Sequence, residues 1–151
     1  MADLLTDKIR SWIGRSAPPQ RVEITRRDII KYAIATEQKL AKYLNGDEAP
    51  PMALFGAHAP IVALEDLGAD GLKPDSLLPA LPLKRVMAGG ISQNHSRPIK
   101  AGDVLIMQRT LVDIFEKQGK TGPLIFIVYE IEAKTEDGEL VMAQTQTRIV
   151  R

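Results

Sequence analysis

The sequence contains no cysteine among its 151 residues. This absence excludes disulfide bonds, cysteine nucleophiles and cysteine-ligated metal sites. It is compatible with a reducing compartment, and we expect a cytoplasmic protein. The only histidines are His58 and His95. Two histidines without cysteine are a poor basis for a zinc site, so we predict no metal.

Long apolar runs and a strong charge bias are also absent. No run approaches the roughly 20 apolar residues that span a bilayer. The first residues, MADLLTDKIRSWIG, mix acids and bases and do not resemble a signal peptide. Twenty basic and 19 acidic residues leave a formal net charge of +1, which favours neither nucleic acid nor an anionic membrane as a partner. The length suits a single domain over residues 1–151.

The first third of the chain carries helical patterns. Apolar residues over 5–13 recur at helical spacing and predict a short amphipathic helix that ends near Gly14. A short edge strand is expected over 21–25. Thr25 and Asp28 then resemble a capping box, and the apolar spacing behind them predicts one longer helix that ends at residues 45–47.

Six of the ten prolines lie between Pro50 and Pro82. Because proline interrupts helices, only short helical pieces are expected within 53–67. A connection of this length and composition often borders a binding site, although it can also be a packed irregular excursion.

Strand patterns dominate after Lys84. We predict a strand over 84–97 and then three long antiparallel strands, with Asp137-Gly138 as a hairpin turn. Apolar residues alternate along 124–134 at odd positions, and the alternation continues at the odd positions of 141–149. The fold class is therefore α+β, with helices segregated from an antiparallel sheet. Exposed sheet edges favour oligomerisation.

His95 is a candidate catalytic base because the unperturbed pKa of histidine lies near neutrality. In strand alternation it shares a face with Gln93 and Arg97, whereas Asn94 faces the other way. No acid or nucleophile follows at a catalytic spacing, so a structural role for His95 is the alternative.

The same region contains a glycine pair and several bases. Gly89-Gly90 lacks the spacing of a phosphate loop and indicates a β-bulge or a close backbone approach. The bases are either scattered over the surface or form an anion site. They are Lys84, Arg85, Arg97 and Lys100.

Several segments, in the same order along the chain, carry a resemblance to a known family. The most specific is the turn Arg97-Pro98-Ile99-Lys100-Ala101-Gly102-Asp103. The others are 28–35, 49–51, 78–83 and 85–90. Over residues 5–150 the sequence resembles the N-terminal type of MaoC-like dehydratase domain, a hotdog-fold relative of hydratases and dehydratases that act on acyl thioesters. The resemblance implies an antiparallel sheet wrapped around a central helix, which here is short or broken.

The sequence departs from the catalytic members of that family at one motif. Those members carry Asp-x-Asn-x-x-His after the Tyr-Ala helix, and the acid and imidazole activate a water that adds across the double bond of an enoyl thioester. Counted from Tyr32, the three positions fall on Gln38, Leu40 and Tyr43. Amide, alkyl and phenol groups cannot replace that pair at neutral pH.

The resemblance therefore implies a subunit of an (R)-type enoyl-CoA hydratase or 3-hydroxyacyl thioester dehydratase. This subunit would be the substrate-binding, non-catalytic half, paired with a catalytic MaoC-type chain or with itself. The thioester of coenzyme A or of an acyl carrier is the expected substrate, with no separate cofactor. Residues 53–64 and 89–95 would line the acyl pocket. The substrate-binding candidates are Gly89, Gly90, Gln93, Asn94, His95 and Arg97.

Two other functions stay open at this point. A homodimeric hotdog acyl thioesterase would need a carboxylate near the central helix, and Glu65 and Asp66 are the available residues. A non-enzymatic acyl-binding or assembly module is the other alternative.

Overall fold

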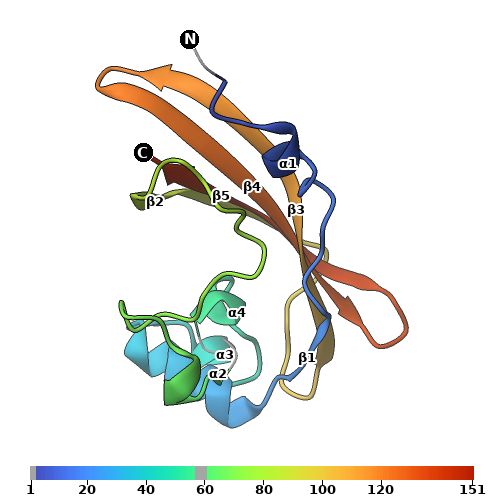
Figure 1. The fold of residues 1–151 in the computed structure, drawn as a ribbon. Helices are drawn as coiled ribbons and strands as arrows, with labels where there is room; N and C mark the ends of the chain where they lie inside the picture. The colour runs from blue at the N-terminus through green and yellow to red at the C-terminus, as the bar shows by residue number, and fades with distance from the viewer. Residues whose placement is uncertain (1–2, 57–60) are drawn as a thin grey trace.

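The computed structural model describes residues 3–56 and 61–151. Five antiparallel strands form one curved sheet in the order β1-β3-β4-β5-β2, and α2, α3 and α4 lie on its concave side (Figure 1). The predicted α+β arrangement is confirmed. The strands are β1 (Gln20–Glu23), β2 (Val86–His95), β3 (Val104–Gly119), β4 (Gly122–Thr135) and β5 (Leu140–Val150). The helices are α1 (Asp7–Arg10), α2 (Arg26–Ala35), α3 (Ala41–Leu44), α4 (Ala53–Gly56) and the 3-10 turn η1 (Leu64–Asp66).

The predicted cap of α2 is present, but the predicted single helix up to Asn45 is wrong. Thr25 Oγ1 accepts a hydrogen bond from the Asp28 N–H at 3.1 Å. The helix ends at Ala35, where Gln38 N–H bonds to the Ala33 carbonyl and Glu37 N–H bonds to the Ile34 carbonyl. Glu37 has φ +54°. These features make a Schellman-type end, so α2 and α3 are separate helices.

Among its described residues, the proline-rich segment contains only short helical pieces, α4 and η1, as its composition predicts. Residues 57–60, and His58 with them, lie outside the described part of the chain. From Leu67 to Arg85 the chain runs without helix or strand. In the described ranges, no helix is long and apolar enough to cross a membrane.

The buried face of β5 differs from the expected one. On β4 the predicted side chains are buried, including Ile125, Ile127 and Tyr129. Their partners on β5 are the even-numbered residues, because Ile127 pairs with Arg148 and Ile125 with Val150. The register shifts between Ala133 and Lys134, which pair with Met142 and Leu140. This shift moves the in-and-out alternation of side chains on β5 by one residue. The concave face of β5 therefore carries Met142, Gln144, Gln146, Arg148 and Val150, and the odd-numbered residues from Ala143 to Ile149 face the other way.

Two apolar clusters cover the concave face. The first packs α2 and α4 on one end of the sheet and includes Ile29, Leu54, Leu105, Ala133 and Met142. The second packs α1 and the segment around Leu77 on the other end, and its buried members include Leu5, Ile9, Leu111, Ile127 and Tyr129.

The two edge strands of the sheet differ in whether another part of the chain covers them. The outer side of β3 is covered by β1 and by residues 14–17, which hydrogen bond to Arg109 and Leu111. The outer side of β2 has no strand partner among the described residues. The predicted bulge in β2 is confirmed: the register shifts between Ala88 and Gly90, and Gly90 has φ +137°, a conformation that favours glycine.

Candidate functional site

A band of polar side chains crosses the concave face between the two apolar clusters. The strand register aligns Arg109 on β3 with Ile131 on β4, Ile131 with Gln144 on β5, and Gln144 with Gln93 on β2. This level lies between Tyr129, which belongs to one cluster, and Ala133, which belongs to the other. We call these side chains the polar belt: Asp75, Gln93, His95, Arg109, Gln144 and Arg148.

One part of the polar belt is a chain of hydrogen-bonded amides. Gln93 Nε2 donates to Gln144 Oε1 at 2.6 Å, and His95 Nε2 lies 3.3 Å from Gln93 Oε1. Gln144 is the buried member, with 4% of its surface exposed. No described residue accepts a hydrogen bond from Gln144 Nε2. Because a buried donor without a partner is costly, this amide is suited to receive a polar group of a ligand.

The other part of the polar belt is an ion cluster. The Asp75 carboxylate, 9% exposed, bonds to Arg109 and, at 2.5 Å, to Arg148. The guanidinium carbons lie 4.6 Å (Arg109) and 5.5 Å (Arg148) from the centre of the Tyr129 ring. Burial, and then the charge of Asp75, raise the pKa of Tyr129 to about 12, so the phenol stays protonated at neutral pH. Through its two ion pairs, Asp75 holds the irregular segment before β2 against the sheet.

The structure separates the residues that the sequence marked as substrate-binding. Gln93 and His95 lie in the polar belt, whereas Asn94 pairs with Ala143 and faces the convex side. Gly89 and Gly90 form the bulge of β2. A Cβ at Gly89 would lie 3.0 Å from the backbone oxygen of Thr147, so close strand packing explains this glycine.

Arg97 has a role in the turn after β2. Its guanidinium bonds to both carboxylate oxygens of Asp103, at 2.8 and 3.3 Å. Asp103 also accepts from the Lys100 N–H at 2.8 Å. Lys84 and Arg85 lie at the other end of a ten-residue strand, which spans about 33 Å. The four bases considered above therefore do not form one anion site.

Replacing Asp103 with Asn is expected to lower the free energy of unfolding by roughly 1–3 kcal/mol at pH 7. Burial alone would raise the pKa of Asp103, but hydrogen bonds from Arg97 and the Lys100 N–H outweigh it and hold that pKa below its usual value. The stabilisation is thus complete above about pH 4 and disappears as the pH falls through the lowered pKa. Denaturant titrations at pH 7 and pH 3 measure the free energies of unfolding of the wild type and of Asp103→Asn, which should approach each other at the lower pH. Asp66→Asn, which alters an exposed carboxylate, is the control. An equal difference in free energy of unfolding between the wild type and Asp103→Asn at both pH values would contradict the prediction.

The other proposed catalytic positions contain no acid–base pair. Gln38 and Leu40 lie between α2 and α3, Tyr43 lies within α3, and the Gln38 side chain bonds to Thr36 Oγ1. Glu65 and Asp66 are exposed on η1. Within residues 3–56 and 61–151, no three His, Cys, Asp or Glu side chains gather as a metal site would require.

The belt's ion cluster was not foreseen from the sequence. Arg109 and Arg148 stand at core-facing strand positions opposite the apolar Ile131 and Ile127, a pairing that only the strand register reveals. Nothing local indicates Asp75, because its segment has no regular structure.

Comparison with known sequences shows the family of this chain. The family model for the FAS1-like dehydratase domain region matches residues 11–144. A UPF0336 protein from Thermobifida fusca is 28% identical over 148 residues, which cover 94% of this chain and 93% of that protein. A UPF0336 protein from Saccharopolyspora erythraea is 30% identical over 146 residues, covering 94% and 90%.

Solved structures show the fold. The ChsH1-ChsH2 complex from Mycobacterium tuberculosis matches with a TM-score of 0.66 at 16% identity, covering 94% of this chain and 90% of that chain. The C-terminally truncated HadBC (3R-hydroxyacyl-ACP dehydratase) complex from the same organism matches with a TM-score of 0.64 at 16% identity, covering 97% and 99%. The (R)-hydratase from A. caviae gives 0.54 at 18% identity, covering 90% and 94%. The chain therefore belongs to the FAS1-like dehydratase-domain family of MaoC-like hotdog proteins.

Proposed function

We propose that this chain is the substrate-binding, non-catalytic subunit of an (R)-type enoyl thioester hydratase or 3-hydroxyacyl thioester dehydratase. Its partner, a MaoC-type chain, supplies the acid–base pair. The observation that carries the proposal is the absence of both groups at Gln38, Leu40 and Tyr43. The polar belt also keeps the buried Gln144 amide without an acceptor for its Nε2 among the described residues.

The chemistry explains why a partner is needed. Hydration requires one group to take a proton from water as its oxygen attacks C3, and a proton must reach the α-carbon. Those transfers need a group whose pKa lies near the working pH. Among the described residues, His95 is the one histidine on the concave face, and its side chain hydrogen bonds there to the Gln93 amide alone. No described carboxylate contacts its ring.

The polar belt suits binding instead. Gln144 Nε2 offers a donor to a substrate oxygen at this level, and His95 Nε2, which donates to Gln93 Oε1, helps to hold the amide chain that positions this donor. In our proposal that oxygen is the thioester carbonyl or the 3-hydroxyl of the substrate. The acyl chain would lie along the neighbouring apolar cluster, with Ala53 and Leu54 of α4 as part of its wall.

The free edge of β2 supports a paired assembly. Ser96 N–H bonds to the Val141 carbonyl, and Arg85 exchanges two backbone bonds with Arg151. Because hydrogen-bonded pairs alternate along antiparallel strands, the backbone groups of Ile91, Gln93 and His95 point away from β5. They are thus suited to accept a strand from a second hotdog chain. Two of the similar solved structures are named as complexes, HadBC and ChsH1-ChsH2.

Reconstitution tests the proposal. The purified chain alone is expected to show no hydration of crotonyl-CoA or longer enoyl-CoA substrates, and activity should appear on mixing with a catalytic MaoC-type chain that carries the intact motif. In the mixture, Gln144→Leu and His95→Ala should each lower kcat/KM about tenfold through loss of one hydrogen bond. Asn94→Ala, on the opposite face, is the matched control. Full activity of the lone chain would overturn the proposal.

The thioesterase alternative gains no support from the position of its carboxylates. Glu65 and Asp66 are exposed on η1, and neither has an ion pair or hydrogen bond to the polar belt among the described residues. Release of free thiol from an acyl-CoA by the lone chain, lost in Glu65→Gln, would favour it over hydration.

A further inference from the structure

An apolar row crosses four strands on the convex face of the sheet. Phe115 on β3 pairs with Phe126 on β4, and Phe126 pairs with Ile149 on β5. Ile149 in turn pairs with Met87 on β2, which is 37% exposed. The two phenylalanine rings stack with their centres 5.0 Å apart. Because the helices and both apolar clusters lie on the concave side (Figure 1), this apolar row stays at the surface of the described structure.

The positions beside the apolar row extend the same surface. Val128, at the next level along the strands, pairs with Thr147. The register shift in β3 adds Val112, which is 37% exposed. A Cβ at Gly89 would lie 3.0 Å from side-chain atoms of Ile149 and Thr147, so the glycine leaves these two side chains uncovered. An exposed apolar surface of this extent is typical of an interaction site.

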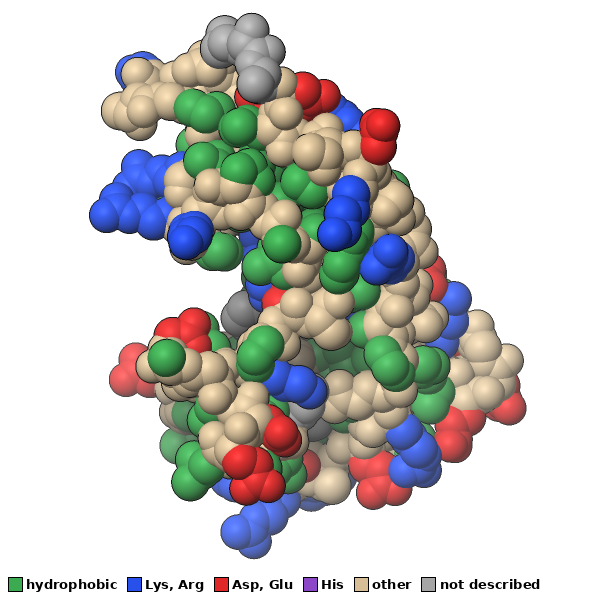
Figure 2. Space-filling view, in the orientation of Figure 1, with side chains coloured by type: hydrophobic (Ala, Val, Ile, Leu, Met, Phe, Trp, Pro, Cys, Tyr) green, Lys and Arg blue, Asp and Glu red, His purple; other side chains and the backbone are tan. Residues whose placement is uncertain are grey.

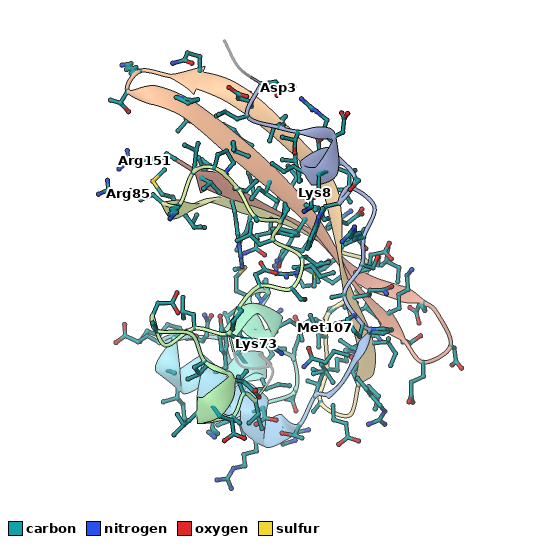
Figure 3. The ribbon with its side chains drawn as sticks, in the orientation of Figure 1. Asp3, Lys8, Lys73, Arg85, Met107 and Arg151 are labelled. Atoms are coloured by element: carbon teal, nitrogen blue, oxygen red, sulfur yellow. The ribbon has the colours of Figure 1, made fainter. Side chains whose placement is uncertain are left out.

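Positive charges lie on one side of the apolar row, at the end of the sheet. Lys117 pairs with Leu124, and its ammonium group lies 5.2 and 5.3 Å from the centres of the two rings. Arg85 and Arg151 exchange two backbone hydrogen bonds at the same level, and strand alternation places both on the convex face. Both side chains extend from this end (Figure 3), and Figure 2 shows blue side chains gathered there, at the upper left.

Negative charges lie on the other side of the apolar row. Asp113 pairs with Val128, and Glu130 pairs with Thr145 one level further along β4. Both acidic residues are exposed, as are the three bases. Among the described residues, none of these five charged groups has an ion-pair partner. The convex face therefore has an apolar centre between an unpaired basic side and an unpaired acidic side.

We propose that this convex face binds the same face of a second copy of the chain, related by a two-fold axis that lies between the two sheets and perpendicular to the strands. Such an axis reverses the strand direction between the copies. It therefore places the basic side of each copy, with Lys117, over the acidic side of the other, with Glu130. A two-fold axis parallel to the strands would place like charges over each other, so charge complementarity selects the first arrangement.

The size of the face suits such a contact. Strands lie about 4.8 Å apart, and successive side chains on one face lie about 6.8 Å apart along a strand, so four strands and four levels cover roughly 500 Å². Two copies together would bury about 1,000 Å², the size of a small specific interface. The contact uses side chains of the convex face, whereas the free edge of β2 offers backbone groups, so the proposal does not depend on the proposed function.

Sedimentation velocity of the purified chain tests the apolar centre of the contact. Ile149→Lys should raise the dissociation constant of the self-associated chain about 100-fold or more, because the new charge would be buried without a partner. Val112→Lys, at a more exposed position of the same face, should act in the same direction and keeps the test valid if Ile149→Lys does not fold. Ile34→Lys is the matched control, since Ile34 is 65% exposed on α2, and it should associate as the wild type does.

Charge reversal tests the orientation of the two copies. Lys117→Glu and Glu130→Lys should each raise the dissociation constant about tenfold, and the chain with both changes should return to within about threefold of the wild type. The two residues lie three levels apart, about 20 Å along the strands, so the recovery can only come from contacts between copies. Self-association should also weaken as sodium chloride rises.

The edge of β2 and other partners are distinguished in the same experiments. Ile91→Pro, which affects only the free edge, should leave the face-to-face contact in place. A monomeric wild type, loss of all self-association in Ile91→Pro, unchanged association in both lysine variants, or no recovery in the doubly reversed chain would each overturn the proposal. If Val112→Lys reduced binding to a catalytic MaoC-type chain but not self-association, the face would belong to that partner, and the proposal would also be overturned.

Discussion

Asp75→Asn is expected to lower the free energy of unfolding by about 3–5 kcal/mol, the cost of removing one partner from a buried ion cluster. The carboxylate is 9% exposed and bonds to both Arg109 and Arg148. Without its charge, two guanidinium groups would remain on the face of Tyr129 with no counterion. For a domain of this size the loss corresponds to a decrease in Tm of roughly 6–20 °C, which calorimetry or thermal circular dichroism can measure.

The same segment offers a matched control for Asp75. Asp70 is exposed and its carboxylate accepts only the Leu72 N–H among the described residues, so Asp70→Asn should change stability by less than about 0.5 kcal/mol. Combining Asp75→Asn with Arg109→Met and Arg148→Met should recover part of the loss, because the uncompensated charges are then removed. A Tm for Asp75→Asn equal to that of Asp70→Asn would show that the cluster contributes little.

The second large effect is expected at the free edge of β2. Ile91→Pro removes a backbone N–H that points away from β5, so it should weaken pairing with another hotdog chain while the β2–β5 ladder remains. Loss of this bond and distortion of its neighbours should raise the dissociation constant about 100-fold. Sedimentation velocity, with the chain alone and with a catalytic MaoC-type chain, gives the measurement.

Ile91→Ala separates backbone pairing from side-chain packing at the same position. It keeps the N–H, and it should therefore associate nearly as well as the wild type. Circular dichroism of both variants checks that the sheet is intact. If Ile91→Pro assembled normally, the partner would have to use another surface. If both variants failed equally, the exposed apolar side chain, 38% accessible in the single chain, would be the main contact.

Local chemistry was enough to predict most elements of the fold. Thr25 and Asp28 mark the start of α2, Asp137-Gly138 closes a hairpin, and the proline spacing excludes a long helix after residue 50. Each of these depends on contacts within a few residues, which a sequence displays directly. The Arg97…Asp103 turn belongs to the same class, because its ion pair and Gly102, with φ +91°, all lie within seven residues.

One error concerns a local helix end, and the other depends on a distant strand partner. The helix after Thr25 continues in apolar spacing through Leu44, yet it ends at Ala35, and Ile34 is left 65% exposed. On β5 either the odd-numbered or the even-numbered side chains could face the core. The register against β4 places the even-numbered ones, including Gln144 and Arg148, on the concave face. Strand register is a pairwise property, and a shift of one residue reverses every side chain.

By itself, the sequence determined the α+β class, the order of the elements, the family resemblance and the absence of the acid and imidazole at Gln38 and Tyr43. These follow from residue identity and local spacing. Only the tertiary structure decided that Asp75 meets Arg109 and Arg148, that Gln93 joins Gln144, and that Arg85 meets Arg151. The partners in these contacts are separated by 34 to 73 residues in the chain. Such contacts exist only after the sheet has brought its strands into register, because no local interaction specifies them.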